Sequence, residues 1–150
     1  MLKAIKQFFE NHIGPIEEQN QDSEHRLRVA TAALLIEIAR ADFHIEDQEL
    51  EHIAAALKTK FQLSAEEVRE LIALATQEAK QAISYYEFTS LINQGFSFEQ
   101  KLKVIELMWQ VAYADDYLQK YEEALIRKIA DLLYIPHSDF IAAKHKVKPH

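Results

Sequence analysis

Apolar side chains recur every three or four residues along almost the whole chain, from Leu2 to Ile141. This spacing places them on one face of an α-helix, whereas a half-buried strand would alternate every second residue. The chain contains only 2 glycines and 3 prolines, too few for the many tight turns of a β-sandwich or β-barrel. The sequence therefore predicts an all-α fold, a helical bundle of seven to eight helices.

Serine residues mark the predicted starts of three helices. Ser64, Ser84 and Ser97 are each followed three residues later by glutamate or glutamine. In such a capping box the serine oxygen accepts a free N–H of the first turn, and the acid or amide accepts the N–H of the serine. Pro136 predicts the start of the last helix, because proline is tolerated in a first turn.

Composition restricts the class of protein and its compartment. A length of 150 residues and a hydrophobic content of 49% suit one domain with its own core. The chain has no cysteine, which excludes disulfides, thiolate metal sites and cysteine nucleophiles. This absence fits a reducing cytoplasm, where we expect the protein to be located.

The acidic charge restricts the partners. A formal net charge of −7 should repel nucleic acid, so we expect no nucleic-acid partner. No segment approaches the roughly 20 apolar residues of a transmembrane helix, and the first helix has few basic residues for peripheral membrane association. A protein partner or a homo-oligomer remains open, and Tyr85, Tyr86 and Tyr117 are candidates for a contact surface.

Two segments of the chain share one pattern. They are ADFHIEDQELEHI at residues 41–53 and ADDYLQKYEEALI at residues 114–126. Each contains Ala-Asp, then an aliphatic residue, a glutamate and an isoleucine at matching positions. The similarity extends upstream, where residues 33–42 align with residues 106–115. A pattern that recurs over this length indicates an internal repeat.

The repeat predicts how the domain is organised. Downstream of the pattern Phe61 aligns with Tyr134, and a deletion of one residue follows. We interpret residues 1–150 as one domain of two half-repeats, approximately residues 1–82 and 83–150, related by a pseudo-twofold axis. Each half alone would leave an apolar face in water, so the two should share one core.

The aspartates of the pattern occupy an unfavourable position. Asp42 and Asp115 each follow a long apolar-periodic segment, at the predicted C-terminal end of a helix. The helix dipole is negative at that end, and an exposed carboxylate there is disfavoured by ~0.3–1 kcal/mol. Because the sequence places an acid there twice, we expect a compensating interaction.

One interpretation is structural. Each aspartate accepts hydrogen bonds from the free N–H groups at the start of the next helix. Glu49 and Glu122 then lie in the first turn of that helix, where a carboxylate is favoured. The acids would fasten consecutive helices together in a ligand-free structural adaptor.

The other interpretation is a divalent-cation site between the helix ends. Carboxylate and carbonyl oxygens are the ligands that Ca²⁺, Mg²⁺ and Mn²⁺ prefer. The predicted metal ligands are Asp42 and Glu49 in one half, and Asp115, Asp116 and Glu122 in the other. A pair of acids per half is fewer ligands than a Ca²⁺ cage normally has, so both interpretations stay open.

Catalysis has weaker support in the sequence. Glu49 and His52 have the Glu-x-x-His spacing of di-iron sites, but such sites need two of these pairs, and the other half offers Glu122 and Leu125. No phosphate-binding glycine loop, serine elbow or HExxH motif is present. We therefore expect a non-enzymatic protein. The alternative is a metal-dependent enzyme that uses the clustered carboxylates with His52.

The repeated pattern Ala-Asp-x-x-aliphatic-x₃-Glu-x₃-Ile resembles the tellurite-resistance TerB family, in particular the TerB-like proteins of bacteria. The resemblance covers roughly residues 23–145. It implies an α-helical bundle in which acids of the motif, here Asp42 with Glu49 and Asp115 with Glu122, are linked to metal binding. It also implies a context of stress and metal-oxyanion resistance, with protein or membrane-linked assemblies and no established catalysis.

The sequence departs from that family at the residue after each aspartate, which is usually glycine. Phe43 and Asp116 occupy these positions. Glycine permits a left-handed backbone, aspartate tolerates it, and phenylalanine resists it. We therefore expect the loop after Asp42 to differ in shape from the loop after Asp115.

Overall fold

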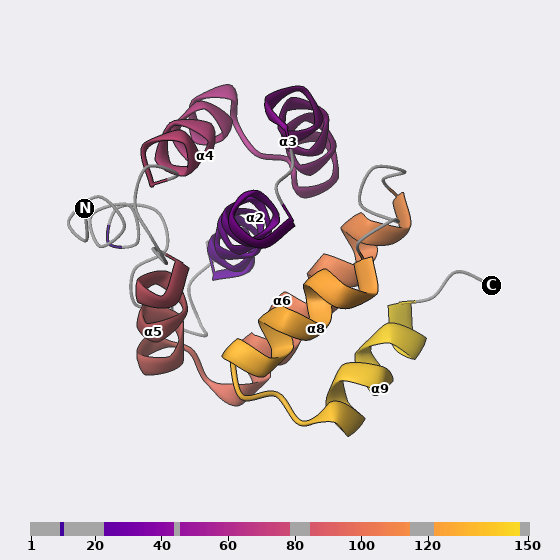
Figure 1. Cartoon of the computed structure of the whole chain (residues 1–150). Helices are drawn as coiled ribbons and strands as arrows, with labels where there is room; N and C mark the ends of the chain where they lie inside the picture. The colour runs from indigo at the N-terminus through magenta and orange to yellow at the C-terminus, as the bar shows by residue number, and fades with distance from the viewer. Residues whose placement is uncertain (1–9, 11–22, 44–45, 79–84, 115–121, 148–150) are drawn as a thin grey trace.

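The computed structural model describes residue 10 and residues 23–43, 46–78, 85–114 and 122–147. Within these ranges the chain forms seven α-helices and no strand (Figure 1), which confirms the all-α prediction. None of these helices is long and apolar enough to span a membrane. The helix predicted before Gly14 lies outside the described residues. The seven helices are α2 (Ser23–Phe43), α3 (Asp47–Phe61), α4 (Ala65–Glu78), α5 (Tyr85–Gly95), α6 (Phe98–Ala114), α8 (Glu122–Leu132) and α9 (His137–Val147).

Helix α2 lies at the centre of the bundle. Every residue from Val29 to Ile36 is at most 1% exposed, and eight consecutive residues point in all directions around a helix. The helix packs against α3, α4, α5, α6 and α8 (Figure 1). Its buried hydroxyl at Thr31 donates a 2.7 Å hydrogen bond to the carbonyl of Leu27, so burial leaves this polar group satisfied.

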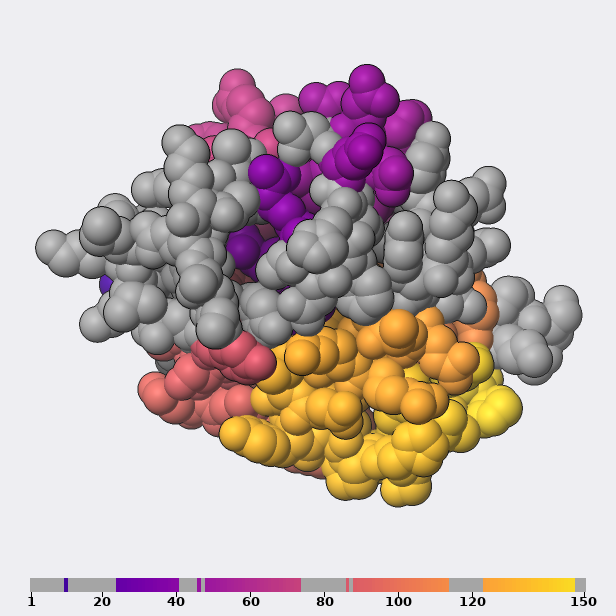
Figure 2. Space-filling view, viewed as in Figure 1, coloured from indigo at the N-terminus to yellow at the C-terminus, as the bar shows by residue number. Residues whose placement is uncertain are grey.

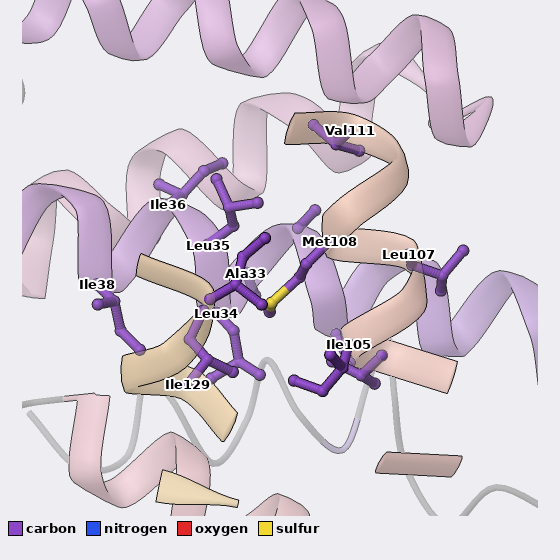
Figure 3. Close-up of a cluster of buried hydrophobic side chains, with 14 of the residues drawn as sticks. Ala33, Leu34, Leu35, Ile36, Ile38, Ile105, Leu107, Met108, Val111 and Ile129 are labelled. Carbon is purple, nitrogen blue, oxygen red and sulfur yellow. The ribbon is translucent and has the colours of Figure 1, made fainter. Parts of the chain in front are cut away.

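Helix α6 is the second central element. It packs against α2, α3, α8 and α9, and its residues Met108 and Trp109 are fully buried. Figure 3 shows Ile105 and Met108 of α6 beside Leu34 of α2 and Ile129 of α8. One continuous apolar core therefore joins the N-terminal and C-terminal helices, as expected for a single domain.

The helices α3 and α8 end in the same way. Each is followed by a residue with a left-handed backbone, Gln62 with φ 57° and Tyr134 with φ 60°. In each case the next N–H reaches back to a carbonyl of the last turn, from Leu63 to Lys58 at 3.0 Å and from Ile135 to Ala130 at 2.9 Å. This is the Schellman arrangement, which usually has glycine at the left-handed position.

These ends correct one detail of the predicted alignment. Tyr134 and Gln62 have the same left-handed backbone conformation. If these two residues are aligned with each other, Phe61 aligns with Leu133. Phe61 and Leu133 are both buried, whereas Tyr134 is 76% exposed. The predicted pairing of Phe61 with Tyr134 is therefore wrong by one residue, and the deletion lies upstream of the two helix ends. The pseudo-twofold relation between the halves stays a prediction.

Two of the three predicted capping boxes are present. Ser64 N–H donates to Glu67 Oε1 at 2.8 Å, and Glu67 N–H donates to Ser64 Oγ at 3.0 Å. Ser97 and Gln100 make the same pair of bonds at 2.8 and 3.1 Å. The box at Ser84 lies outside the described residues. Pro136 lies one residue before α9, where its carbonyl accepts the N–H of Phe140 at 3.0 Å.

Glu67 also joins α4 to the central helix. His25 Nε2 of α2 lies 2.8 Å from Glu67 Oε2. Burial raises the pKa of Glu67, but hydrogen bonds from Ser64 and His25 and the charge of His25 outweigh it, so that the pKa lies below its usual value. A single side chain thus caps α4 and holds it against α2.

We predict that Gln62→Gly raises the free energy of unfolding by about 0.5–1 kcal/mol, because glycine adopts the left-handed conformation without the steric cost of a Cβ. Urea denaturation followed by circular dichroism measures the change. Gln62→Ala is the matched control, because alanine keeps the Cβ and should give no gain. Equal stability of the glycine and alanine variants would contradict the prediction.

We predict that Glu67→Gln lowers the free energy of unfolding at pH 7 by about 0.5–1 kcal/mol, because glutamine keeps the capping box and loses the ion pair. A carboxyl whose folded pKa is lowered stabilises the protein above its unfolded pKa, and this contribution disappears as the pH falls through the folded pKa. The difference between the two proteins should therefore vanish in acid.

The matched control is Glu66→Gln, which removes an exposed acid from the same helical turn without touching His25. Urea denaturation at several pH values from 7 down to the acid limit compares the three proteins. A loss that is as large for Glu66→Gln, or that persists unchanged in acid, would rule out the ion pair as its cause.

Candidate functional site

The first acidic motif lies where α2 ends and α3 begins. Asp42 is in the last turn of α2, and Glu49 is the third residue of α3, in the first turn as predicted. Helix α2 continues through Phe43, so the residue after Asp42 is helical, as expected for phenylalanine in place of glycine. The side chain of Asp42 lies outside the described part of the structure.

The second motif is described only at its two ends. Helix α6 ends at Ala114, and Glu122 is the first residue of α8. Asp115 and Asp116 fall outside the described residues, as does the side chain of Glu122. The structure therefore places the backbone of Glu122 in a first helical turn, as predicted, and the ligand role of all three acids stays a prediction.

Helix α3 contacts both central helices. It packs against α2, whose end carries Asp42, and also against α6, whose end leads to Asp115. The carboxyl ends of α2 and α6 carry the negative ends of the two central helix dipoles. The helix that follows the first motif thus contacts the helix that precedes the second.

The start of α3 lacks a cap from its own flanking residue. Glu46 has an extended backbone and makes no side-chain cap hydrogen bond, while its carbonyl accepts the N–H of Leu50 at 2.9 Å. The first N–H groups of a helix have no partner within the helix. An acceptor from elsewhere, such as the Asp42 carboxylate, would satisfy them.

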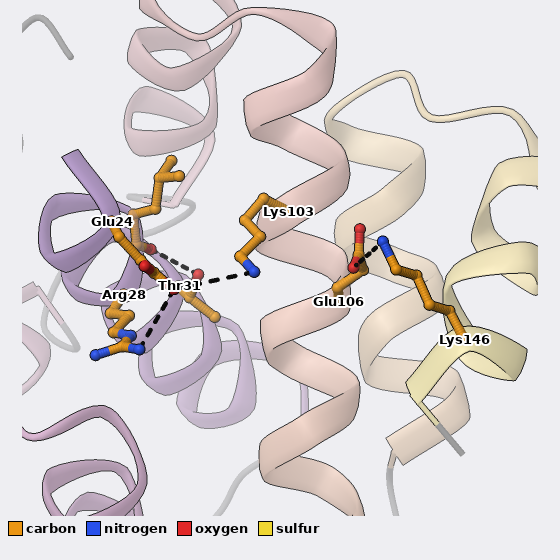
Figure 4. Close-up of polar contacts among 7 residues, drawn as sticks. Glu24, Arg28, Thr31, Lys103, Glu106 and Lys146 are labelled. Atoms are coloured by element: carbon orange, nitrogen blue, oxygen red, sulfur yellow. Dashed lines mark hydrogen bonds and ion pairs between the residues drawn. The ribbon is translucent and has the colours of Figure 1, made fainter. Parts of the chain in front are cut away.

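Glu49 is half-buried, and no hydrogen bond or ion pair joins it to another described residue. Other acids of the central helices are paired with cations (Figure 4). Glu24 lies 3.3 Å from Arg28 and 4.0 Å from Lys103 of α6, and Glu106 lies 3.1 Å from Lys146 of α9. The carboxylate of Glu49 is therefore available to a ligand or to a neighbouring motif residue.

His52 lies on the exposed side of α3. No group of three or more histidines and acids that could hold a metal ion forms within the described ranges. Glu49 and His52 consequently have no third metal ligand there. A cation site at this place would need ligands whose side chains the structure does not describe, such as Asp42, Asp115, Asp116 or Glu122.

A second concave feature was not predicted from the sequence. A groove of about 360 Å³ lies between α5 and the end of α8, which adjoin in Figure 2. Tyr86, expected at a contact surface, is 44% exposed on its rim, whereas Tyr85 and Tyr117 have no described side chain. The groove joins segments 39 residues apart at Asn93 and Leu132, so no local sequence signal marks it.

Comparison with known proteins identifies the family. The family described as "Tellurite resistance protein TerB" matches residues 28–145, a range that runs from the central helix α2 into α9 and includes both acidic motifs. No significant match was found among curated proteins or among solved structures. The match covers most of the chain, so this helical domain belongs to the TerB tellurite-resistance family.

Proposed function

We propose that this TerB domain is a non-enzymatic module that binds a divalent cation through its repeated acids and presents the resulting surface to a protein partner. The predicted ligands are Asp42, Glu49, Asp115, Asp116 and Glu122. One observation carries the proposal: the two central helices pack against each other, and each has an aspartate at its carboxyl end, Asp42 in the last turn of α2 and Asp115 directly after α6.

Electrostatics supports a cation at this place. The last carbonyls of a helix have no partner within it, and the dipole gives that end a partial negative charge. An aspartate adds a full negative charge, and the half-buried Glu49 of the next helix lacks a described cationic partner. Main-chain carbonyls, carboxylates and water together supply the oxygen ligands that Ca²⁺, Mg²⁺ or Mn²⁺ requires.

A structural role is the second candidate, and it too has a specific observation in its favour. Helix α3 starts without a side-chain cap from Glu46, so Asp42 could accept its free N–H groups. This arrangement would neutralise the aspartate without a cation. The two roles differ in whether added metal changes the stability of the protein.

The proposal that the protein is not an enzyme rests on the kinds of metal-ligating residue that the repeated pattern contains. Motif spacing gives Glu122 and Leu125 as the counterparts of Glu49 and His52, so the repeat duplicates carboxylates but not a histidine. The biological context, a response to metal or oxyanion stress, rests on membership of the TerB family. A bound cation that changes the shape of the helix ends would let a partner sense metal.

We predict that Ca²⁺ or Mn²⁺ raises the melting temperature of the full chain and that a chelator reverses the rise. A ligand at 100 times its Kd stabilises the native state by about 2.7 kcal/mol. Asp115→Asn should abolish the rise, and Asp42→Asn should reduce it. Glu51→Gln is the matched control, because Glu51 is an exposed acid of α3 outside the repeated pattern.

The melting experiment distinguishes the cation-binding role from the structural role. If no metal shifts the melting temperature of the native protein, the cation site is rejected. In that case Asp42→Ala and Asp115→Ala should each lower the free energy of unfolding by about 0.5–2 kcal/mol in the presence of chelator, as the loss of a helix cap does. If neither substitution destabilises the protein, the structural role is rejected as well.

A further inference from the structure

We propose that the groove between α5 and the end of α8 binds the guanidinium group of an arginine side chain on a protein partner. This site is separate from the acidic motifs. Its volume of about 360 Å³ is sufficient for one such side chain. The groove is lined by Tyr86, Thr89, Ser90, Asn93, Gln94, Asp131, Leu132 and Tyr134.

The wall of the groove is mostly apolar and contains a few hydrogen-bond acceptors. Asn93 Nδ2 donates to the carbonyl of Leu132 at 3.0 Å, and this bond fixes the orientation of the amide. Asn93 Oδ1 is buried and has no hydrogen-bond partner among the described residues. A buried acceptor without a partner is costly, so a small local movement that lets a ligand in the groove donate to Oδ1 would be favoured.

Negative charge accompanies these acceptors. Asp131 is exposed in the last turn of α8, and no ion pair joins it to another described residue. The end of α8 adds the negative end of its helix dipole. The whole chain has a net charge of −7, which favours the approach of a basic partner. The ligand that complements this wall is therefore a cation with several N–H donors.

Tyr134 gives the groove an aromatic wall at a conformational cost. The residue has a left-handed backbone, and its side chain is 76% exposed, so core packing does not explain a large aromatic residue at this position. Lys101 Nζ lies 5.9 Å from the centre of the ring, so an incoming guanidinium must use the other face of the ring or displace this lysine. Tyr86 provides a second exposed ring on the rim.

The acceptors, the negative charge and the aromatic rings of the groove together favour a guanidinium group over an ammonium group. Guanidinium is planar, stacks on aromatic rings and carries five N–H donors in a fixed fork. It can donate to Asp131 and Asn93 while one face lies on a tyrosine ring. An ammonium group is a more strongly hydrated point charge and lacks the planar face. Whether the groove binds arginine more tightly than lysine is therefore a direct test of the proposal.

The test is a titration of the ¹⁵N-labelled full chain with N-acetyl-arginine amide, followed by NMR. The expected shifts are saturable and include the side-chain amide of Asn93 and the backbone amide of Tyr134. N-acetyl-lysine amide should bind several-fold more weakly. Asp131→Asn and Tyr134→Gly should each weaken the binding of the arginine probe about tenfold.

Two matched control variants test whether a loss of arginine binding is specific to changes in the groove. Gln62→Gly relieves the same left-handed backbone at the end of α3 but leaves the groove intact, so its affinity should equal that of the native protein. Asp139→Asn removes an acid from α9, away from the groove, and should also bind normally. The proposal is overturned if the shifts lie away from the residues that line the groove, if lysine binds as tightly as arginine, or if Asp131→Asn and Tyr134→Gly bind normally.

Discussion

The burial of α2 on all its sides is the constraint on which the rest of the structure depends. Five other helices contact it, and its central two turns have almost no exposed surface. A helix that is apolar all round is stable only when other elements cover it completely. The close-packed core therefore resists any shift of the buried turns of α2.

The burial of the central helices bears on the acids at their carboxyl ends. An acid at the end of an isolated helix could turn into water at little cost, but Asp42 ends a helix that the core holds in place. Helix α6 is the second central helix, and Trp109 and Met108 anchor it in the same core. An acid in the last turn of α2 and another directly after α6 are both disfavoured by the negative helix ends, and the cation role and the structural role each neutralise them.

Local chemistry could be predicted from the sequence, and long-range geometry could not. The capping boxes at Ser64 and Ser97 depend on residues three positions apart, so they appear in the structure as predicted. The contact of His25 with Glu67 spans 42 residues and depends on how α4 packs. The constant spacing of the repeated pattern pairs Tyr134 with Phe61, but Tyr134 is exposed with a left-handed backbone and Phe61 is buried. For the metal site, the sequence indicates which acids recur but not how far apart their oxygen atoms lie.

The central claim is that the duplicated acids hold a cation at the carboxyl ends of α2 and α6. Crystals of the full chain grown or soaked with Mn²⁺ test it most directly, through the anomalous difference density at a wavelength where manganese scatters strongly. The account predicts a peak within coordination distance of the Asp115 carboxylate, with a second one near Asp42 and Glu49 where both halves are occupied. Density that shows these carboxylates bonded to helix N–H groups or water, with no anomalous peak beside them, would contradict it.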